Sequence, residues 1–240
     1  KVLRNSLFKQ LTKEYLKPKF LFFKNIFFQS MPISISICGY ALAASIIFTY
    51  VGQSGEYAVA GYGAGTRIEQ VVLLPILGIN TALISIISQN FGAKNFDRIK
   101  ETYFTSIKYS FIIMITAGTI VFTSADYITS IFSDDPEVIE YGKRYLKISA
   151  FVLPAYPIFF LSNGFFMALK KSENAMISNF FRNVLNPIAV FYIAKYISAS
   201  FNTFFWIWVS INWFFSISYL LIIIYYFKTK LDKSSAVVHP

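Results

Sequence analysis

Long apolar segments alternate with short polar connections along the chain. Each apolar segment has at least 17 residues with few or no charges, the length that a helix needs to cross a hydrocarbon layer of about 30 Å. Windows of about 19 residues place six such spans, at residues 26–50, 58–88, 103–125, 148–169, 175–197 and 204–227. The pattern predicts an all-α integral membrane protein with six transmembrane helices.

The composition supports this class of protein. Hydrophobic residues make up 55% of the 240 residues and charged residues only 14%, which is too apolar for a soluble domain of this length. An ordinary soluble enzyme is therefore excluded. We expect a cytoplasmic amphipathic linker at 1–19, a six-helix transmembrane lobe at 20–230 and a cytoplasmic tail at 231–240. Within the lobe, Asp134-Asp135-Pro136-Glu137 predicts the start of a short helix on the outer surface that runs toward the fourth span.

The distribution of basic residues predicts the orientation. The chain has 22 Lys and Arg against 12 Asp and Glu, a net charge of +10. With the N-terminus inside, fifteen of the basic residues fall on the side of the two termini and only Lys143, Arg144 and Lys147 on the other. Because basic loops stay in the cytoplasm, we expect a multi-pass protein of the cell membrane with both termini cytoplasmic. The positive balance then reflects topology, and we expect the lipid bilayer, not nucleic acid, as the partner.

Polar residues recur at helical spacing in the second span and form one stripe. In lipid such a stripe faces other helices or a watered cavity, because an unpaired polar group in hydrocarbon costs several kcal/mol. Spans one, four and five carry further polar positions. Together they predict a substrate or ion pathway lined by Gln29, Tyr62, Thr66, Arg67, Glu69, Gln70, Asn80, Asn163, Arg182 and Asn186. Polar contacts between packed helices are the alternative explanation.

Arg67 and Glu69 are charged positions deep within the second span. Glu69 lies about 16 Å along the helix from Ala58, near mid-membrane if the hydrocarbon core begins there. A charge at that depth costs at least ~2.5 to 3.5 kcal/mol, so a functional role is the default interpretation. Residues two apart lie about 200° apart around a helix, so each charge needs its own partner elsewhere. The alternative is that both lie shallower and extend toward water.

Small residues and prolines predict local packing. Gly61 and Gly65 are four residues apart, which permits close approach of another helix. Kinks are expected at Pro75, Pro154 and Pro157, since proline frees a backbone carbonyl.

The sequence contains no pattern of catalytic residues. The single histidine, His239, lies in the tail, Cys38 is the single cysteine, and no phosphate-binding loop or metal-ligand cluster is present. We therefore expect no enzyme activity and no cofactor apart from a coupling ion. Aromatic residues reach 19%; most suit interfacial belts, and a subset lining a cavity would suit cationic aromatic ligands.

The segments AVAGYGAGTRIEQ at 58–70 and QNFGAKNFDR at 89–98 resemble the multidrug and toxic compound extrusion (MATE) family. They look like the second helix of that family's C-terminal six-helix lobe and the cytoplasmic loop after it. Residues 162–169, with Arg182, Leu185 and Pro187, resemble the fourth and fifth helices of the same lobe.

The resemblance implies one lobe of a twelve-helix, two-lobe transporter, similar to the bacterial multidrug-exporter branch. It implies an N-terminal six-helix lobe as partner and export of small organic substrates, often cationic, in exchange for protons or sodium ions. Some members of another branch have carboxylates in the first and fourth helices of this lobe, and this chain has none there. The coupling carboxylate is then expected in the first lobe or at Glu69. The alternatives are a lipid-linked oligosaccharide flippase of the same superfamily and a non-transporting membrane scaffold.

Overall fold

The computed structural model describes residues 20–231, so the predicted linker at 1–19 and nearly all of the predicted tail lie outside the described residues. Within them the chain is helical, with no strand. The elements are α1 (Phe20–Gly52), α2 (Glu56–Gly92), α3 (Phe96–Thr123), α4 (Ala125–Ser130), α5 (Pro136–Ser149), α6 (Ala155–Ala168), α7 (Ser172–Phe180), the π-helical turn η4 (Phe181–Leu185), α8 (Asn186–Tyr196), α9 (Phe201–Tyr226) and a second π-helical turn, η5 (Phe227–Leu231).

The predicted all-α membrane fold is confirmed. The six spans correspond to α1, α2, α3, α6, the continuous run from α7 through α8, and α9. In the described part of the chain, three helices are long and apolar enough to cross a membrane, at Glu56–Gly92, Phe96–Thr123 and Phe201–Thr229. The shorter apolar helices are Cys38–Gly52 and Ala155–Ala168.

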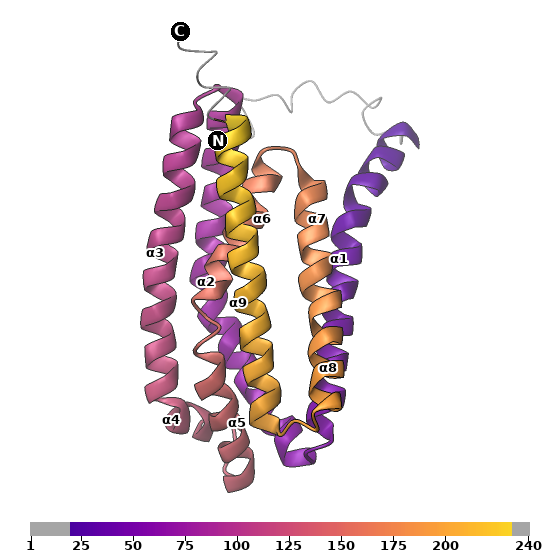
Figure 1. Ribbon diagram of the computed structural model, residues 1–240, viewed down its shortest axis with the longest axis vertical. Coiled ribbons are helices and arrows are strands. Elements are labelled where there is room, and N and C mark those ends of the chain that lie inside the picture. Colours follow the sequence, from indigo (N-terminus) through magenta and orange to yellow (C-terminus); the bar gives the residue numbers. More distant parts are fainter. Residues whose placement is uncertain (1–19, 232–240) are drawn as a thin grey trace, which may run out of the picture.

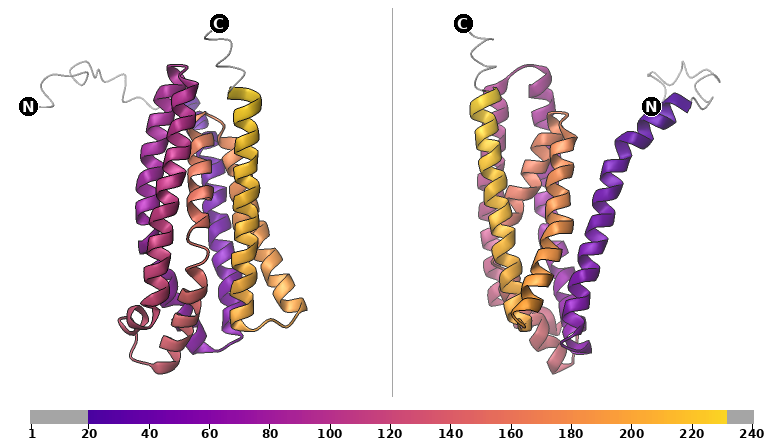
Figure 2. Two further views of the ribbon diagram at one scale, coloured as in Figure 1. Left: turned by 60° about the vertical axis from the view of Figure 1, so that its left-hand side comes forward. Right: turned by 45° about the vertical axis from the view of Figure 1, so that its right-hand side comes forward.

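The helices run up and down along one axis, with α6 at the centre (Figure 1). Nearly all of α6 is buried because α2, α3 and α9 pack around it. α1 packs on α7, η4 and α8, while its first half leans away from the bundle (Figure 2). The start of α1, the end of α9 and the α2–α3 and α6–α7 turns lie at one end, and α4 and α5 lie at the other (Figure 1).

The end of the bundle that carries α4 and α5 contains one confirmed element and one that was not predicted. The predicted helix start at Asp135 is confirmed, since its side chain accepts a hydrogen bond from the backbone N–H of Glu137 at 2.9 Å and Pro136 opens α5. The short helix α4 was not predicted. Its contact with α5 includes an ion pair between Lys143 and Asp126 at 2.6 Å.

The fourth span is broken, contrary to the prediction of one helix over 148–169. Turns at 150–154 separate α5 from α6, and Pro154 caps the start of α6. Proline has no backbone N–H, so it cannot extend the α5 helix in regular form. The indole Nε1 of Trp213 on α9 donates to the carbonyl oxygen of Phe151 at 2.8 Å. A side chain from another helix thus satisfies a carbonyl group in the break. By contrast, α2 remains one helix through Pro75.

The fifth span changes helix type midway. The π-helical turn η4 joins α7 to α8 without a loop, and Pro187 follows in the first turn of α8. Asn186 at this junction is fully buried, and neither polar atom of its side chain has a hydrogen-bond partner among residues 20–231. An unpaired buried amide is costly, and π-helical turns are concentrated at functional sites. The junction adjoins the cavity described next.

Candidate functional site

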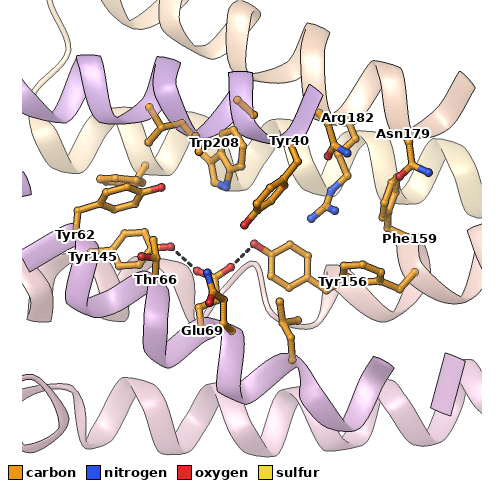
Figure 3. Close-up of a pocket in the computed structure, with 18 of the residues that line it drawn as sticks. Tyr40, Tyr62, Thr66, Glu69, Tyr145, Tyr156, Phe159, Asn179, Arg182 and Trp208 are labelled. Carbon is orange, nitrogen blue, oxygen red and sulfur yellow. Dashed lines mark hydrogen bonds between the residues drawn. The ribbon is translucent and has the colours of Figure 1, made fainter. Parts of the chain in front are cut away.

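A cavity of about 480 Å³ lies among α1, α2, α5, α6, the α7–η4 segment and α9. Its volume is within the range of about 300 to 1,000 Å³ that is usual for small-molecule sites. The aromatic side chains on its walls are Tyr40, Tyr62, Tyr145, Tyr156, Phe159, Phe160, Phe205 and Trp208. The polar side chains are Thr66, Glu69, Gln70, Asn179, Arg182 and Asn183. Most of these residues are labelled in Figure 3.

Glu69 is held by two tyrosines. The hydroxyl group of Tyr145, from α5, donates to Oε2 of Glu69, and the hydroxyl group of Tyr156, from α6, donates to Oε1 (Figure 3). Each carboxylate oxygen therefore has a neutral donor from a different helix. The expectation that Glu69 has a partner outside its own helix is confirmed, and these partners are tyrosines.

Arg182 lies across the cavity, on the π-helical turn η4. Its guanidinium carbon lies 4.2 Å from the ring centroid of Phe159, 4.9 Å from that of Tyr156 and 5.5 Å from that of Phe160. Its Nε donates to Oδ1 of Asn212 on α9 at 3.4 Å. Three aromatic rings and an amide thus fix this guanidinium beside Tyr156, which also binds Glu69.

Three other predicted residues of the second span line the same cavity. Tyr62 is buried, with its ring centroid 4.9 Å from that of Tyr145 and 5.4 Å from that of Phe205. Thr66 donates its hydroxyl hydrogen to the carbonyl of Gly63 at 2.9 Å, and Gln70 is exposed at the rim. The helical periodicity of the stripe therefore placed one face of α2 on the cavity.

The remaining predicted residues lie elsewhere. Arg67 is exposed and does not line the cavity, because it lies on a different face of α2 from Glu69. Asn80 lies against Gly164 of α6. Asn163 accepts from the hydroxyl of Tyr219 at 3.1 Å and donates to Asn179 at 3.5 Å, so it links α6, α9 and α7.

Two predicted residues stand apart from these. Asn186 is buried at the helix junction described above. The side chain of Gln29 lies outside the described residues.

Tyr145 and Tyr40 are cavity residues that were not predicted. Tyr156 and Asn179 were among the polar positions of the fourth and fifth spans that suggested a watered interior, and both line the cavity. Tyr145 belongs to α5 and Tyr156 to the fourth span, and no sequence spacing connects either of them to Glu69. One indirect signal was Gly65, since a side chain there would collide with the ring of Tyr145. In the part of the chain that the structure describes, no group of three or more His, Cys, Asp or Glu side chains is arranged to hold a metal ion.

The sequence and the fold match known proteins. The model of the MatE family matches residues 32–193, more than half of the chain. The chain belongs to the MatE family. Relatives include a FAD transporter of Shewanella oneidensis, 26% identical over 156 residues that cover 65% of this chain and 34% of the relative. The multidrug export protein MepA of Staphylococcus haemolyticus is 26% identical over 164 residues, which cover 68% of this chain and 36% of the relative.

Solved structures share the fold of this MatE chain. A MOP superfamily transporter from Pyrococcus furiosus matches with a TM-score of 0.80 at 20% identity, covering 94% of this chain and 50% of that one. An inward-facing multidrug resistance MATE transporter matches with a TM-score of 0.82 at 18% identity, covering 94% of this chain and 51% of that one. The chain therefore spans about half the length of the solved structures, and the segments matched to the two relatives span about a third of theirs. The predicted family is confirmed, and the size corresponds to one lobe.

Proposed function

We propose that this chain is the C-terminal lobe of a secondary-active exporter that moves small organic solutes in exchange for protons or sodium ions. The observation that carries the proposal is Glu69, a carboxylate within a membrane-spanning helix that lines a drug-sized cavity. A carboxylate is costly to place within the membrane. Its presence in a transmembrane helix therefore usually marks an ion or substrate pathway. The names of the relatives, a FAD transporter and multidrug exporters, support transport of organic solutes.

The hydrogen bonds of Glu69 indicate how ion exchange would affect the cavity. Tyr145 and Tyr156 both donate to the carboxylate, so they stabilise its charged form. A proton or sodium ion arriving at Glu69 would weaken or redirect these bonds, which tie α2 to α5 and α6. Ion binding would thereby change the contacts between helices that line the cavity. No other cofactor is required.

The first prediction tests Glu69. In a bacterium lacking its own exporters, the complete gene should raise resistance to aromatic toxic compounds, and Glu69→Gln should reduce this gain by about tenfold or more, as for loss of an interaction of about 1.4 kcal/mol. Gln is nearly isosteric but cannot carry the charge. Minimum inhibitory concentrations, with membrane levels checked by immunoblot, give the measurement.

Glu101→Gln is the matched control, since Glu101 is exposed on α3, where it pairs with Arg98 at 2.8 Å, and it does not line the cavity. It should export normally. Normal export by Glu69→Gln across a range of pH and sodium concentration would refute the assignment. If neither the parent protein nor Glu69→Gln raised resistance, the flippase or the scaffold would be favoured. Assays of lipid-linked oligosaccharide translocation would then distinguish these two.

We also propose that both chain ends face the cytoplasm of a bacterial cell, where the partner N-terminal lobe would be joined. The structure places the turns carrying Lys94 and Lys170 at the same end as the start of α1 (Figure 1). The basic residues Lys143 and Lys147 of α5 lie toward the opposite end.

The second prediction tests this orientation with single cysteines in a Cys38→Ser background. An impermeant maleimide added to intact cells should label Ser54→Cys, in the turn between α1 and α2, and Asp135→Cys, which directly precedes α5. It should miss Asn95→Cys in the α2–α3 turn until the cells are opened. Labelling of Asn95→Cys alone in intact cells would invert the topology.

A further inference from the structure

Arg182 forms no direct ion pair with any of the described residues, although Glu69 lies near enough to interact with it electrostatically. Its hydrogen-bonding neighbours are the amide of Asn212 and the hydroxyl group of Tyr156, both neutral. No Asp or Glu of the described chain comes within the 4.0 Å ion-pair distance of its nitrogens. A guanidinium has five N–H donors, so donors remain available on the side that faces the cavity (Figure 3). A positive charge within the membrane is thus left open to a ligand.

Glu69 does not neutralise this charge by direct contact. Both of its oxygens accept hydrogen bonds from tyrosines, and one of those tyrosines, Tyr156, contacts Glu69 and Arg182 alike. Figure 3 shows the Tyr156 ring between the two charged groups. The carboxylate is therefore already hydrogen-bonded, whereas the guanidinium is the charged group with free capacity.

The aromatic rings next to Arg182 are already in contact with its guanidinium group. A ligand cation would need the face of an electron-rich ring, within about 6 Å of its centroid. Arg182 itself occupies such positions on Tyr156, Phe159 and Phe160. A second cation at these rings would meet the guanidinium charge. This half of the cavity therefore disfavours the cationic ligands that the aromatic content alone would suit.

We propose that the cavity binds planar aromatic solutes that carry a carboxylate or sulfonate group, with the anion on Arg182 and the ring against Tyr40 and Trp208. This inference rests on the proposed function and names the substrate class of the same site. Guanidinium and carboxylate groups match in a bidentate, charge-assisted geometry, which would give Arg182 the direct ionic contact that it lacks among the described residues. Tyr40 and Trp208 line the cavity and make no ring stacking contact with Arg182.

The test compares two probes that share one ring and differ in charge. The complete gene product is purified into lipid nanodiscs, and calorimetry measures the binding of 2-naphthoate and of 2-naphthyltrimethylammonium without any ion gradient. We expect naphthoate to bind at least tenfold more tightly than the cation. Arg182→Gln should abolish this preference by weakening naphthoate tenfold or more, and Arg182→Lys should retain part of it, since it keeps the charge without the bidentate fork.

Arg98→Gln is the matched control, because Arg98 is exposed at the start of α3 and is not among the residues that line the cavity. It should bind both probes as the parent protein does.

If Arg182→Gln does not give a monodisperse protein, the preference of the parent protein for naphthoate and the partial retention of that preference in Arg182→Lys decide the matter. Equal binding of the two probes, preference for the cation, or binding of neither would overturn the proposal. Resistance that depends on Glu69 together with cation preference would contradict this inference alone, whereas naphthoate binding without any export would contradict the proposed function.

Discussion

Gly61→Ala should destabilise the lobe by about 1 to 3 kcal/mol, as extra methyl groups do in a closely packed interior. The new Cβ would lie 2.6 Å from the carbonyl oxygen of Val138 and 2.7 Å from the backbone nitrogen of Gly142. Both are backbone atoms of α5, so no side-chain rotation relieves the collision and α2 must move away from α5. Because Tyr145 reaches Glu69 from α5, this movement would also disturb the carboxylate site.

The measurement is the midpoint of thermal unfolding of the complete protein in detergent, followed by size-exclusion chromatography after heating. Gly63→Ala and Gly78→Ala are matched controls on the same helix, since neither added Cβ meets any atom within 4 Å. They should leave the midpoint unchanged or raise it slightly, because Ala has the better helix propensity. A midpoint for Gly61→Ala equal to those of the controls would show that the α2–α5 contact is looser than the structure indicates.

Features of one helix at a time could be predicted from the sequence. The length of the apolar segments predicted the spans, the Asp135-Pro136 pair predicted the start of α5, and Gly61 with Gly65 predicted a close helix contact. Each depends on geometry that neighbouring residues of one helix impose. The same holds for the stripe of Tyr62, Thr66 and Glu69, which now lines the cavity. The functional role of these residues stays a prediction.

Features that depend on a second helix could not be predicted. Periodicity placed Glu69 on the polar stripe and Arg67 on another face of the helix, but it could not identify the groups that contact Glu69. In the structure, Tyr145 and Tyr156 converge on it from α5 and α6. Arg182 was predicted to line the pathway from the polar spacing of the fifth span. Its contacts with the rings of α6 and its place on a π-helical turn could not be predicted.

The break in the fourth span has the same origin. Pro154 predicted a kink in the helix. A break of several residues within a membrane protein also requires hydrogen-bond donors for the backbone carbonyls that it exposes. Trp213 supplies one from α9, a helix that lies far along the chain. The sequence around Pro154 is therefore compatible with either a kink or a break. The donor that makes the break possible, Trp213, could be identified only in the structure.

These 240 residues alone should show no gradient-driven transport. Alternating access in transporters with paired bundles requires two bundles that rock against each other around a shared site. The chain spans about half the length of the solved transporters whose fold it shares.

The surface of α2 supports the same expectation. Gln70, Thr81, Ser85 and Ser88 are exposed along this helix, although the segment is apolar enough to span a membrane. Polar groups facing lipid are unfavourable, so we expect this face to be covered by the partner lobe in the complete transporter. In the isolated chain the same face should promote self-association, visible as dimers or larger species in detergent by size-exclusion chromatography with light scattering.

Proteoliposomes provide the decisive comparison. Vesicles containing the complete protein should take up a fluorescent aromatic solute when a proton or sodium gradient is imposed, and vesicles containing the 240 residues alone should match empty vesicles. Co-reconstitution of the separately expressed upstream lobe should restore uptake, because the cavity of this lobe then faces its partner. Robust exchange by the 240-residue chain alone would show instead that two copies form the transporter, with the exposed polar face of α2 as the contact between them.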